Sequence, residues 1–135
     1  MDSNMTLHIV DPDGTLKWYQ NDKLHREDGP AVIWADGSQE WYLNGKRHRE
    51  DGPAIICPNG YQAWLQNGKF HREDGPAFIQ PNGRKEWYLN GQLHREDGPA
   101  VIFPSGDEEW YLNGIEFKTQ DKFNINTQFS IKNGF

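Results

Sequence analysis

The segment His-Arg-Glu-Asp-Gly-Pro-Ala occurs four times in this sequence, and it gathers residue types that bind metals or move protons. Its histidines and aspartates are His25, His48, His71 and His94, with Asp28, Asp51, Asp74 and Asp97. Imidazole and carboxylate groups are common zinc ligands and common general acids and bases. One such site needs several of these groups around one point.

The spacing of the four copies argues against such a site. Equivalent residues are 23 positions apart. If each copy adds two strands to a sheet, equivalent side chains lie about 9–10 Å apart. A zinc ion lies only about 2.0–2.3 Å from each ligand, so neighbouring histidines do not share one. Four nearly equivalent surroundings also differ from the distinct environment of a catalytic group. We therefore predict no metal, no cofactor and no enzyme activity.

A structural role explains the same segment more simply. Asp51-Gly52 predicts a turn in which the carboxylate accepts backbone N–H groups. Arg49 is long enough to reach an acidic residue of an adjacent unit. We expect a ladder of surface ion pairs, each contributing about 0–1 kcal/mol, that sets the register of the units.

The elements that position these segments follow from a 23-residue repeat. Its tryptophans are Trp18, Trp41, Trp64, Trp87 and Trp110, which we expect to form a stacked core column. Within one unit, a β-prone run at 31–34 and another at 39–43 are separated by Asp36-Gly37, and Asn44-Gly45 follows. Such dipeptides favour tight hairpin turns. We predict an all-β fold: an elongated, single-layer antiparallel sheet of about five hairpin repeats over residues 9–117.

The composition agrees with this fold and restricts the partners. The chain has 135 residues, 35% of them hydrophobic, with 14 Gly, 8 Pro and a mean hydropathy of −0.94. Its net charge of −6 argues against nucleic acid and anionic membranes. The single Cys57 forms no disulfide within the chain. Because the N-terminus also lacks a signal-peptide pattern, we expect a cytoplasmic protein.

Alternation along the strands predicts two faces in every unit. One face carries Ala31, Ile33, Trp41 and Leu43, and the other carries Val32, Trp34, Glu40 and Tyr42. The column Trp34, Cys57, Gln80 and Phe103 varies between units, as does the column of Glu40. We expect both variable columns to face solvent or a partner.

A tyrosine follows the tryptophan in four of the five units, at Tyr19, Tyr42, Tyr88 and Tyr111, and Leu65 takes its place in the third. Two interpretations stay open. The rings pack against the His-Arg-Glu-Asp segments, or they form a ridge that binds a partner, because amphipathic rings are enriched in interfaces.

The motifs Trp-Tyr-Leu-Asn-Gly-Lys and His-Arg-Glu-Asp-Gly-Pro-Ala resemble a divergent subtype of the MORN repeat, seen in bacterial antitoxin-like, phage and giant-virus proteins. The resemblance covers residues 9–117. It implies a scaffold built as an elongated single-layer sheet, and it implies no reaction. The strand Glu-Trp-Tyr-Leu departs from the usual Tyr-x-Gly-x-Trp pattern of the family, which weakens any transfer of lipid binding.

The two ends follow other rules. We assign residues 1–8 to an N-terminal cap and 118–135 to a C-terminal cap. The segment Phe123–Ile131 alternates apolar and polar residues, which is typical of a half-buried strand. It caps the array, pairs with another chain as in a homodimer, or gives way to a short helix.

These observations predict a non-enzymatic protein-binding module, either a scaffold or an antitoxin-like or viral inhibitor of a partner protein. The expected contact residues are Trp34, Cys57, Gln80 and Phe103 with Tyr42, Tyr88 and Tyr111. The alternative is a peripheral membrane adaptor that binds anionic lipid through the lysine edge of Lys23, Lys46 and Lys69 with Arg47.

Overall fold

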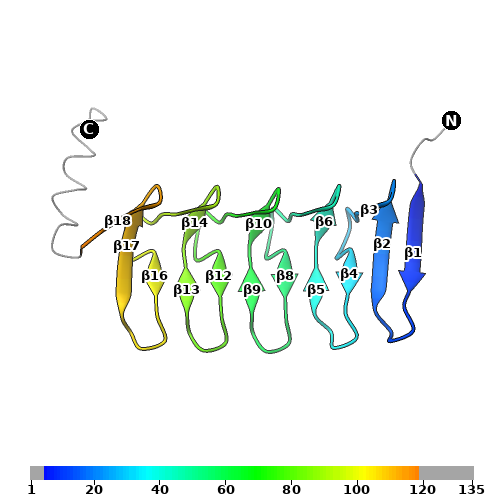
Figure 1. Ribbon diagram of the computed structural model, residues 1–135, viewed down its shortest axis with the longest axis horizontal. Coiled ribbons are helices and arrows are strands. Elements are labelled where there is room, and N and C mark those ends of the chain that lie inside the picture. The colour runs from blue at the N-terminus through cyan, green and yellow to red at the C-terminus, as the bar shows by residue number, and fades with distance from the viewer. Residues whose placement is uncertain (1–4, 119–135) are drawn as a thin grey trace.

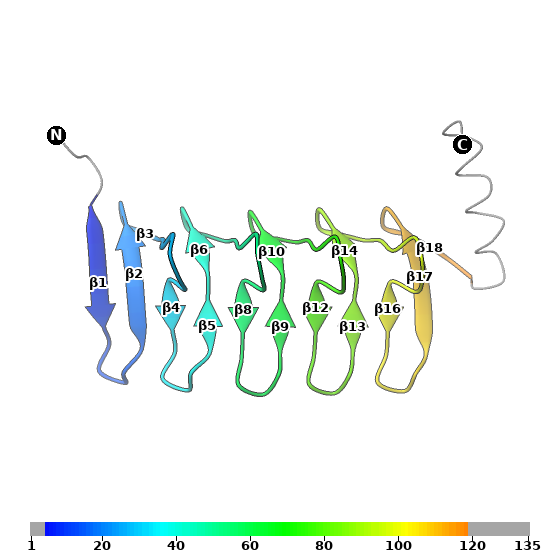
Figure 2. The ribbon, with the colours of Figure 1, turned by 180° about the vertical axis from the view of Figure 1, so that it is seen from behind.

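A computed structural model describes residues 5–118 of the chain. These residues form 18 short antiparallel strands and no helix, arranged as one open row of hairpins (Figure 1). Figure 2 shows the same row from behind. The predicted elongated single-layer sheet is confirmed. The predicted C-terminal cap and the segment Phe123–Ile131 lie outside the described residues.

Each unit contains two hairpins in succession. In the second unit, β4 (Val32–Ile33) pairs with β5 (Gln39–Glu40), and β6 (Tyr42–Leu43) pairs with β7 (Lys46–Arg47). The sequence predicted the first hairpin and the second turn, but not the short strand after that turn.

The other units repeat this plan. The remaining strands are β1 (Thr6–Val10), β2 (Leu16–Gln20), β3 (Lys23–Leu24), β8 (Ile55–Ile56), β9 (Gln62–Ala63), β10 (Leu65–Gln66), β11 (Lys69–Phe70), β12 (Phe78–Ile79), β13 (Lys85–Glu86), β14 (Tyr88–Leu89), β15 (Gln92–Leu93), β16 (Val101–Ile102), β17 (Glu108–Leu112) and β18 (Ile115–Phe117). Twelve of the strands form one sheet in the order β1-β2-β4-β5-β8-β9-β12-β13-β16-β17-β18, with β3 beside β2. Each unit therefore advances the sheet by two strands.

The two turns of a unit depend on residues that accept a positive φ. Asn44 and Gly45 have φ angles of 51° and 80°, as the tight turn between antiparallel strands requires. In the other turn, Gly37 has a φ of 93° and the Asp36 Oδ1 accepts a hydrogen bond of 2.8 Å from the Ser38 N–H. That bond lowers the pKa of Asp36, so the carboxylate that shapes the turn stays charged.

The register confirms the two predicted faces. Val32 pairs with Glu40, and Ile33 pairs with Gln39. We call the side of Val32 and Glu40 the aromatic face. We call the other side, which carries Trp41, the link face, because the four His-Arg-Glu-Asp-Gly-Pro segments cover it. These links are residues 25–30, 48–53, 71–76 and 94–99.

Alanine, not tryptophan, occupies the deepest column of the array. Ala31, Ala54, Ala77 and Ala100 are fully buried. Of the five repeat tryptophans only Trp110 is buried, and the other four are half-buried. The expected tryptophan core is corrected in this respect. A single-layer sheet has no second sheet to cover a large ring, so the links cover it only in part.

The first strand continues the array rather than standing apart from it. β1 begins at Thr6, pairs with β2 along its whole length, and stacks His8 on Trp18 with ring centroids 4.2 Å apart. The boundary between cap and array at residue 9 stays a prediction. Residues 5–118 form no helix long and apolar enough to cross a bilayer.

Candidate functional site

Each link is folded on itself by its arginine. The Arg72 Nε donates to the Asp74 Oδ1 at 2.9 Å, and its Nη1 donates to the Pro76 carbonyl oxygen at 3.1 Å. The guanidinium carbon lies 3.8 Å from the centroid of the Trp64 ring. A Cβ on Gly75 would approach that carbon to 2.8 Å, so only glycine leaves room for the guanidinium. We call this arrangement the arginine clip.

All four links carry the clip. Its arginine, aspartate and tryptophan are Arg26, Asp28 and Trp18, then Arg49, Asp51 and Trp41, then Arg72, Asp74 and Trp64, and finally Arg95, Asp97 and Trp87. The expectation that these arginines pair with acidic residues of adjacent units was wrong. Because the link turns back within two residues, the aspartate of the same link is the nearer partner.

The histidines make the contact between units that was expected of the arginines. The Asn67 N–H donates to the His48 Nδ1 at 2.9 Å, across a separation of 19 residues. The same bond joins Asn44 to His25, Asn90 to His71 and Asn113 to His94, at 2.9–3.0 Å. The fixed spacing between histidine and asparagine in the sequence was the available signal. These bonds align each Asn-Gly turn with the preceding unit.

We expect the single substitutions His25→Ala, His48→Ala, His71→Ala and His94→Ala to be similarly mild. Each removes one acceptor from a backbone N–H together with a ring that is only 8–14% exposed, at a cost of about 1–2 kcal/mol of unfolding free energy. Urea denaturation of the four variants measures this. A loss at one position several times larger than at the others would contradict a shared structural role.

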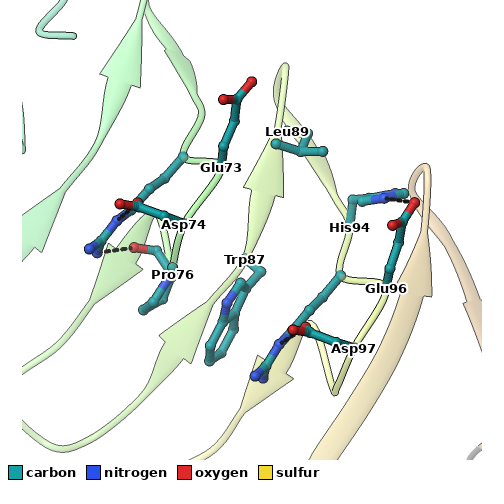
Figure 3. Close-up of a pocket in the computed structure, with 11 residues that line it drawn as sticks. Glu73, Asp74, Pro76, Trp87, Leu89, His94, Glu96 and Asp97 are labelled. Carbon is teal, nitrogen blue, oxygen red and sulfur yellow. Dashed lines mark hydrogen bonds and ion pairs between the residues drawn. The ribbon is translucent and has the colours of Figure 1, made fainter. Parts of the chain in front are cut away.

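Successive links enclose three equivalent grooves on the link face. Their volumes are about 590, 590 and 620 Å³. Figure 3 shows the groove between the links at 71–76 and 94–99, with Trp87 standing between them. Glutamates and aspartates of both links line it, together with Leu89 and His94.

The carboxylates of the links point outward. The side chains of Glu73 and Asp74 are 85% and 87% exposed. The Arg72 guanidinium lowers the pKa of Asp74, which keeps this carboxylate charged. Within residues 5–118, no cluster of three or more histidine, cysteine, aspartate or glutamate side chains has the arrangement to hold a metal ion.

On the aromatic face, glutamates that we expected to be exposed accept hydrogen bonds from the surrounding side chains. Glu40 is only 9% exposed and accepts three hydrogen bonds. The donors are the Trp34 Nε1 at 2.7 Å, the Tyr42 hydroxyl at 2.9 Å and the Arg47 Nε at 3.0 Å. The expectation for the Glu40 column was wrong because donors from neighbouring positions replace the water that the carboxylate loses.

Other units repeat this arrangement or replace it as a whole. Glu86, which is 8% exposed, accepts bonds of 2.6 Å from both the Arg84 Nε and the Tyr88 hydroxyl. In the third unit the positions of the glutamate and the tyrosine hold the apolar residues Ala63 and Leu65, which are both buried. In the third unit the glutamate and the tyrosine are thus replaced together, whereas the first unit keeps Tyr19 beside Lys17.

The predicted tyrosines lie on the aromatic face and not against the links. The Tyr42, Tyr88 and Tyr111 hydroxyls donate to Glu40, Glu86 and Glu109. Of the variable column, Trp34 is exposed, while Cys57, Gln80 and Phe103 are half-buried. The structure places all seven predicted contact residues on this one face.

Further rings that the sequence did not single out join this surface. Phe70 stacks on Tyr88 at 4.9 Å and meets Phe78 edge-on at 5.9 Å, and Tyr61 also contacts Phe78. At the end of the row, the Arg84 guanidinium lies 4.7 Å from the Phe103 ring. Aromatic side chains thus follow the sheet from the second unit to the fifth.

Tyrosine ionisation gives a pH-dependent prediction. Burial, aided by the Glu109 carboxylate, raises the pKa of Tyr111 to about 12. Burial aided by Glu40 and Glu86 likewise raises the pKa values of Tyr42 and Tyr88. A tyrosine whose pKa is raised by folding stabilises the fold below the ordinary value near 10 and loses that contribution above it. We expect stability to fall between about pH 10 and 12.

Two measurements check this prediction. Tyrosinate absorbance of the folded chain should develop a late component that Tyr111→Phe diminishes. Denaturation at several alkaline pH values should show a shallower loss of stability in Tyr111→Phe than in the parent. Identical titration curves for the two proteins would contradict the assignment.

The lysine edge is narrower than the sequence suggested. Arg47 turns to the aromatic face, where it pairs with Glu40 at 3.0 Å and lies 5.5 Å from the Tyr42 ring. Without it the edge keeps Lys23, Lys46 and Lys69, each at the start of the short strand that follows an Asn-Asp or Asn-Gly turn. The guanidinium of Arg47 is therefore no longer available to bind lipid at this edge. Lipid binding through the three lysines stays a prediction.

No family model matches this chain, and no curated protein matches it. The resemblance to MORN repeats therefore depends on the residues of the repeat itself.

Proposed function

We propose that this protein is a non-enzymatic, MORN-like repeat module that binds another protein through its aromatic face. The observation that carries the proposal is the row of half-exposed rings held in place by Glu40 and Glu86. Trp34, which is 41% exposed, is fixed at its indole N–H by Glu40. A ring that is already held loses less conformational entropy on binding.

The chemistry of this surface suits a protein partner. Tyr, Trp and Arg are the residues that most often dominate protein–protein binding energies, and the aromatic face presents all three. The negative net charge disfavours phosphate-rich partners. The free Cys57 fits a reducing compartment such as the cytoplasm. A scaffold and an inhibitor would both use such a surface.

Single substitutions on the two faces test the proposal. The immobilised chain is compared with Trp34→Ala and with Ile115→Ala, an exposed apolar residue that pairs with Leu112 on the link face. Proteins retained from a cell extract are identified, and the affinity of each is then measured with purified material. We expect Trp34→Ala to weaken binding about 30-fold and Ile115→Ala to leave it unchanged.

Other outcomes have defined meanings. Equal retention by both variants contradicts binding through the aromatic face. Salt-sensitive flotation of the chain with vesicles of anionic lipid, lost on substitution of Lys23, Lys46 and Lys69, would favour the membrane-adaptor alternative instead.

A further inference from the structure

The grooves of the link face offer a binding chemistry that the arginine clips do not use. Each clip occupies one aspartate and one arginine, which leaves one glutamate in every link. Glu27, Glu50, Glu73 and Glu96 are 73–85% exposed, and each lies 3.5–3.9 Å from the histidine of its own link. The structure thus holds a regular row of outward carboxylates beside three grooves.

We propose that this row of grooves binds an extended basic segment of a partner protein, with one arginine or lysine side chain in each groove. The inference shares with the proposed function only the idea that the chain is a binding module. It concerns the opposite face of the sheet, so each idea can fail alone.

The wall of each groove suits a cation. Figure 3 shows Trp87 with Asp74 and Pro76 on one side and Asp97 on the other. The Arg95 guanidinium lies 3.9 Å from the centroid of this indole. A second cation entering from the side of Asp74 would meet the indole and the Asp74 Oδ2, because the clip engages the Oδ1 of this exposed carboxylate. Cations bind the faces of tryptophan rings, and an adjacent carboxylate adds a charge-assisted hydrogen bond.

The spacing of the grooves selects the backbone of the ligand. Each unit advances the sheet by two strands, so neighbouring grooves are about 9–10 Å apart. A polyproline II helix repeats every three residues and rises about 9.3 Å in that distance. Side chains at every third residue therefore point to one side and match the grooves in register. An α-helix rises about 5.4 Å in one turn and about 10.8 Å in two, so neither repeat fits the spacing as closely.

Charge decides between this ligand and others with a regular spacing. A nucleic acid also presents evenly spaced charges, but its phosphates have the same sign as the row of glutamates. A metal ion would need several ligands around one point, and residues 5–118 provide no such cluster. A basic peptide is the ligand whose charge and period both agree with the grooves.

Labelled peptides test the inference with the full chain. The probe is a capped heptapeptide with arginine at its first, fourth and seventh positions and proline elsewhere. Its control has the same composition with the three arginines adjacent. We expect fluorescence anisotropy to show the spaced peptide binding about 10-fold more tightly than its isomer. The affinity should also fall as salt is added.

Matched variants assign the binding to the grooves. The double variant Glu73→Gln/Glu96→Gln removes two outward carboxylates without touching a clip, and it should weaken the spaced peptide about 10-fold. Glu116→Gln, which removes an exposed carboxylate opposite Tyr111 on the other face, should have little effect.

Three results would overturn the inference. They are equal binding of the two peptides, equal effects of the two sets of variants, and no binding of either peptide at low salt. The first two indicate attraction by net charge alone. Retention of a protein partner that depends on Trp34 would survive all three, so the aromatic face is judged separately.

Discussion

Arg72→Ala lowers the free energy of unfolding by about 2–3 kcal/mol. The side chain is three-quarters buried, with 23% of its surface exposed, and it makes a hydrogen bond to a backbone carbonyl while covering the Trp64 ring. A hydrogen bond from a charged group contributes about 1.5–3 kcal/mol, and a cation over an indole contributes about 0.5–2 kcal/mol. The loss leaves the Pro76 carbonyl without its donor and opens one side of the ring.

Arg72→Lys should recover only part of this stability. Lysine keeps the charge, but it lacks the planar fork that reaches Asp74 and Pro76 together. Gly75→Ala should also disrupt the clip, because the Cβ of the new alanine would lie 2.8 Å from the guanidinium carbon of Arg72. We expect Gly75→Ala to destabilise the fold by about 1–3 kcal/mol.

Urea denaturation followed by tryptophan fluorescence measures these changes. Gln92→Ala changes an exposed position in the short strand β15, which pairs with β14, and serves as a neutral control. If Arg72→Ala were no more destabilising than Gln92→Ala, the clip would have no structural role. In that case the arginines of the links would be free to serve a partner.

Glu40→Ala should have the second large effect, a loss of about 2–3 kcal/mol. Three donors converge on this buried carboxylate, and the substitution leaves all three without their acceptor. An unsatisfied buried polar group costs about 1–3 kcal/mol. Trp34 and Arg47 are exposed enough to recover water, which limits the total. Glu109→Ala, which loses a single bond from Tyr111, should cost about 1 kcal/mol.

The third unit supplies a sharper version of this experiment. There the positions of glutamate and tyrosine hold Ala63 and Leu65, which pack into an apolar cluster with Trp41 and Ile55. We expect the double variant Glu40→Ala/Tyr42→Leu to be more stable than the sum of its single changes by about 1 kcal/mol. A double-mutant cycle by urea denaturation measures this coupling. Strictly additive losses would show that Glu40 and Tyr42 act independently.

Both experiments concern features that the repeat pattern predicts only in part. The turn dipeptides Asp36-Gly37 and Asn44-Gly45 were enough to predict the hairpins, and the alternation along the strands was enough to predict the two faces. The depth of each column was not predictable in the same way. Ala54 is fully buried while Trp41 is half-buried, because depth depends on which segment crosses over each position.

The candidate binding surface was also predicted only in part. The sequence placed Trp34, Tyr42 and Phe103 on one face, and the structure agrees. It did not predict that Glu40 holds Trp34 and Tyr42 in place. Variability between units was a misleading sign of exposure for this glutamate, because the whole Glu40–Tyr42 pair is replaced in the third unit.

What the sequence determined by itself was therefore the architecture: the 23-residue period, the Asn-Gly turns with their positive φ, and the alternation of faces. The turns and the alternation depend on residues a few positions apart, and the period is visible as one pattern repeated along the chain. The tertiary structure decided how the polar groups are satisfied. In the structure Arg72 pairs with Asp74 of its own link, and His48 accepts a hydrogen bond from the next unit. Glu40 is buried and accepts hydrogen bonds from three donors. Such choices depend on distances across strands and between units, which a one-dimensional pattern does not contain.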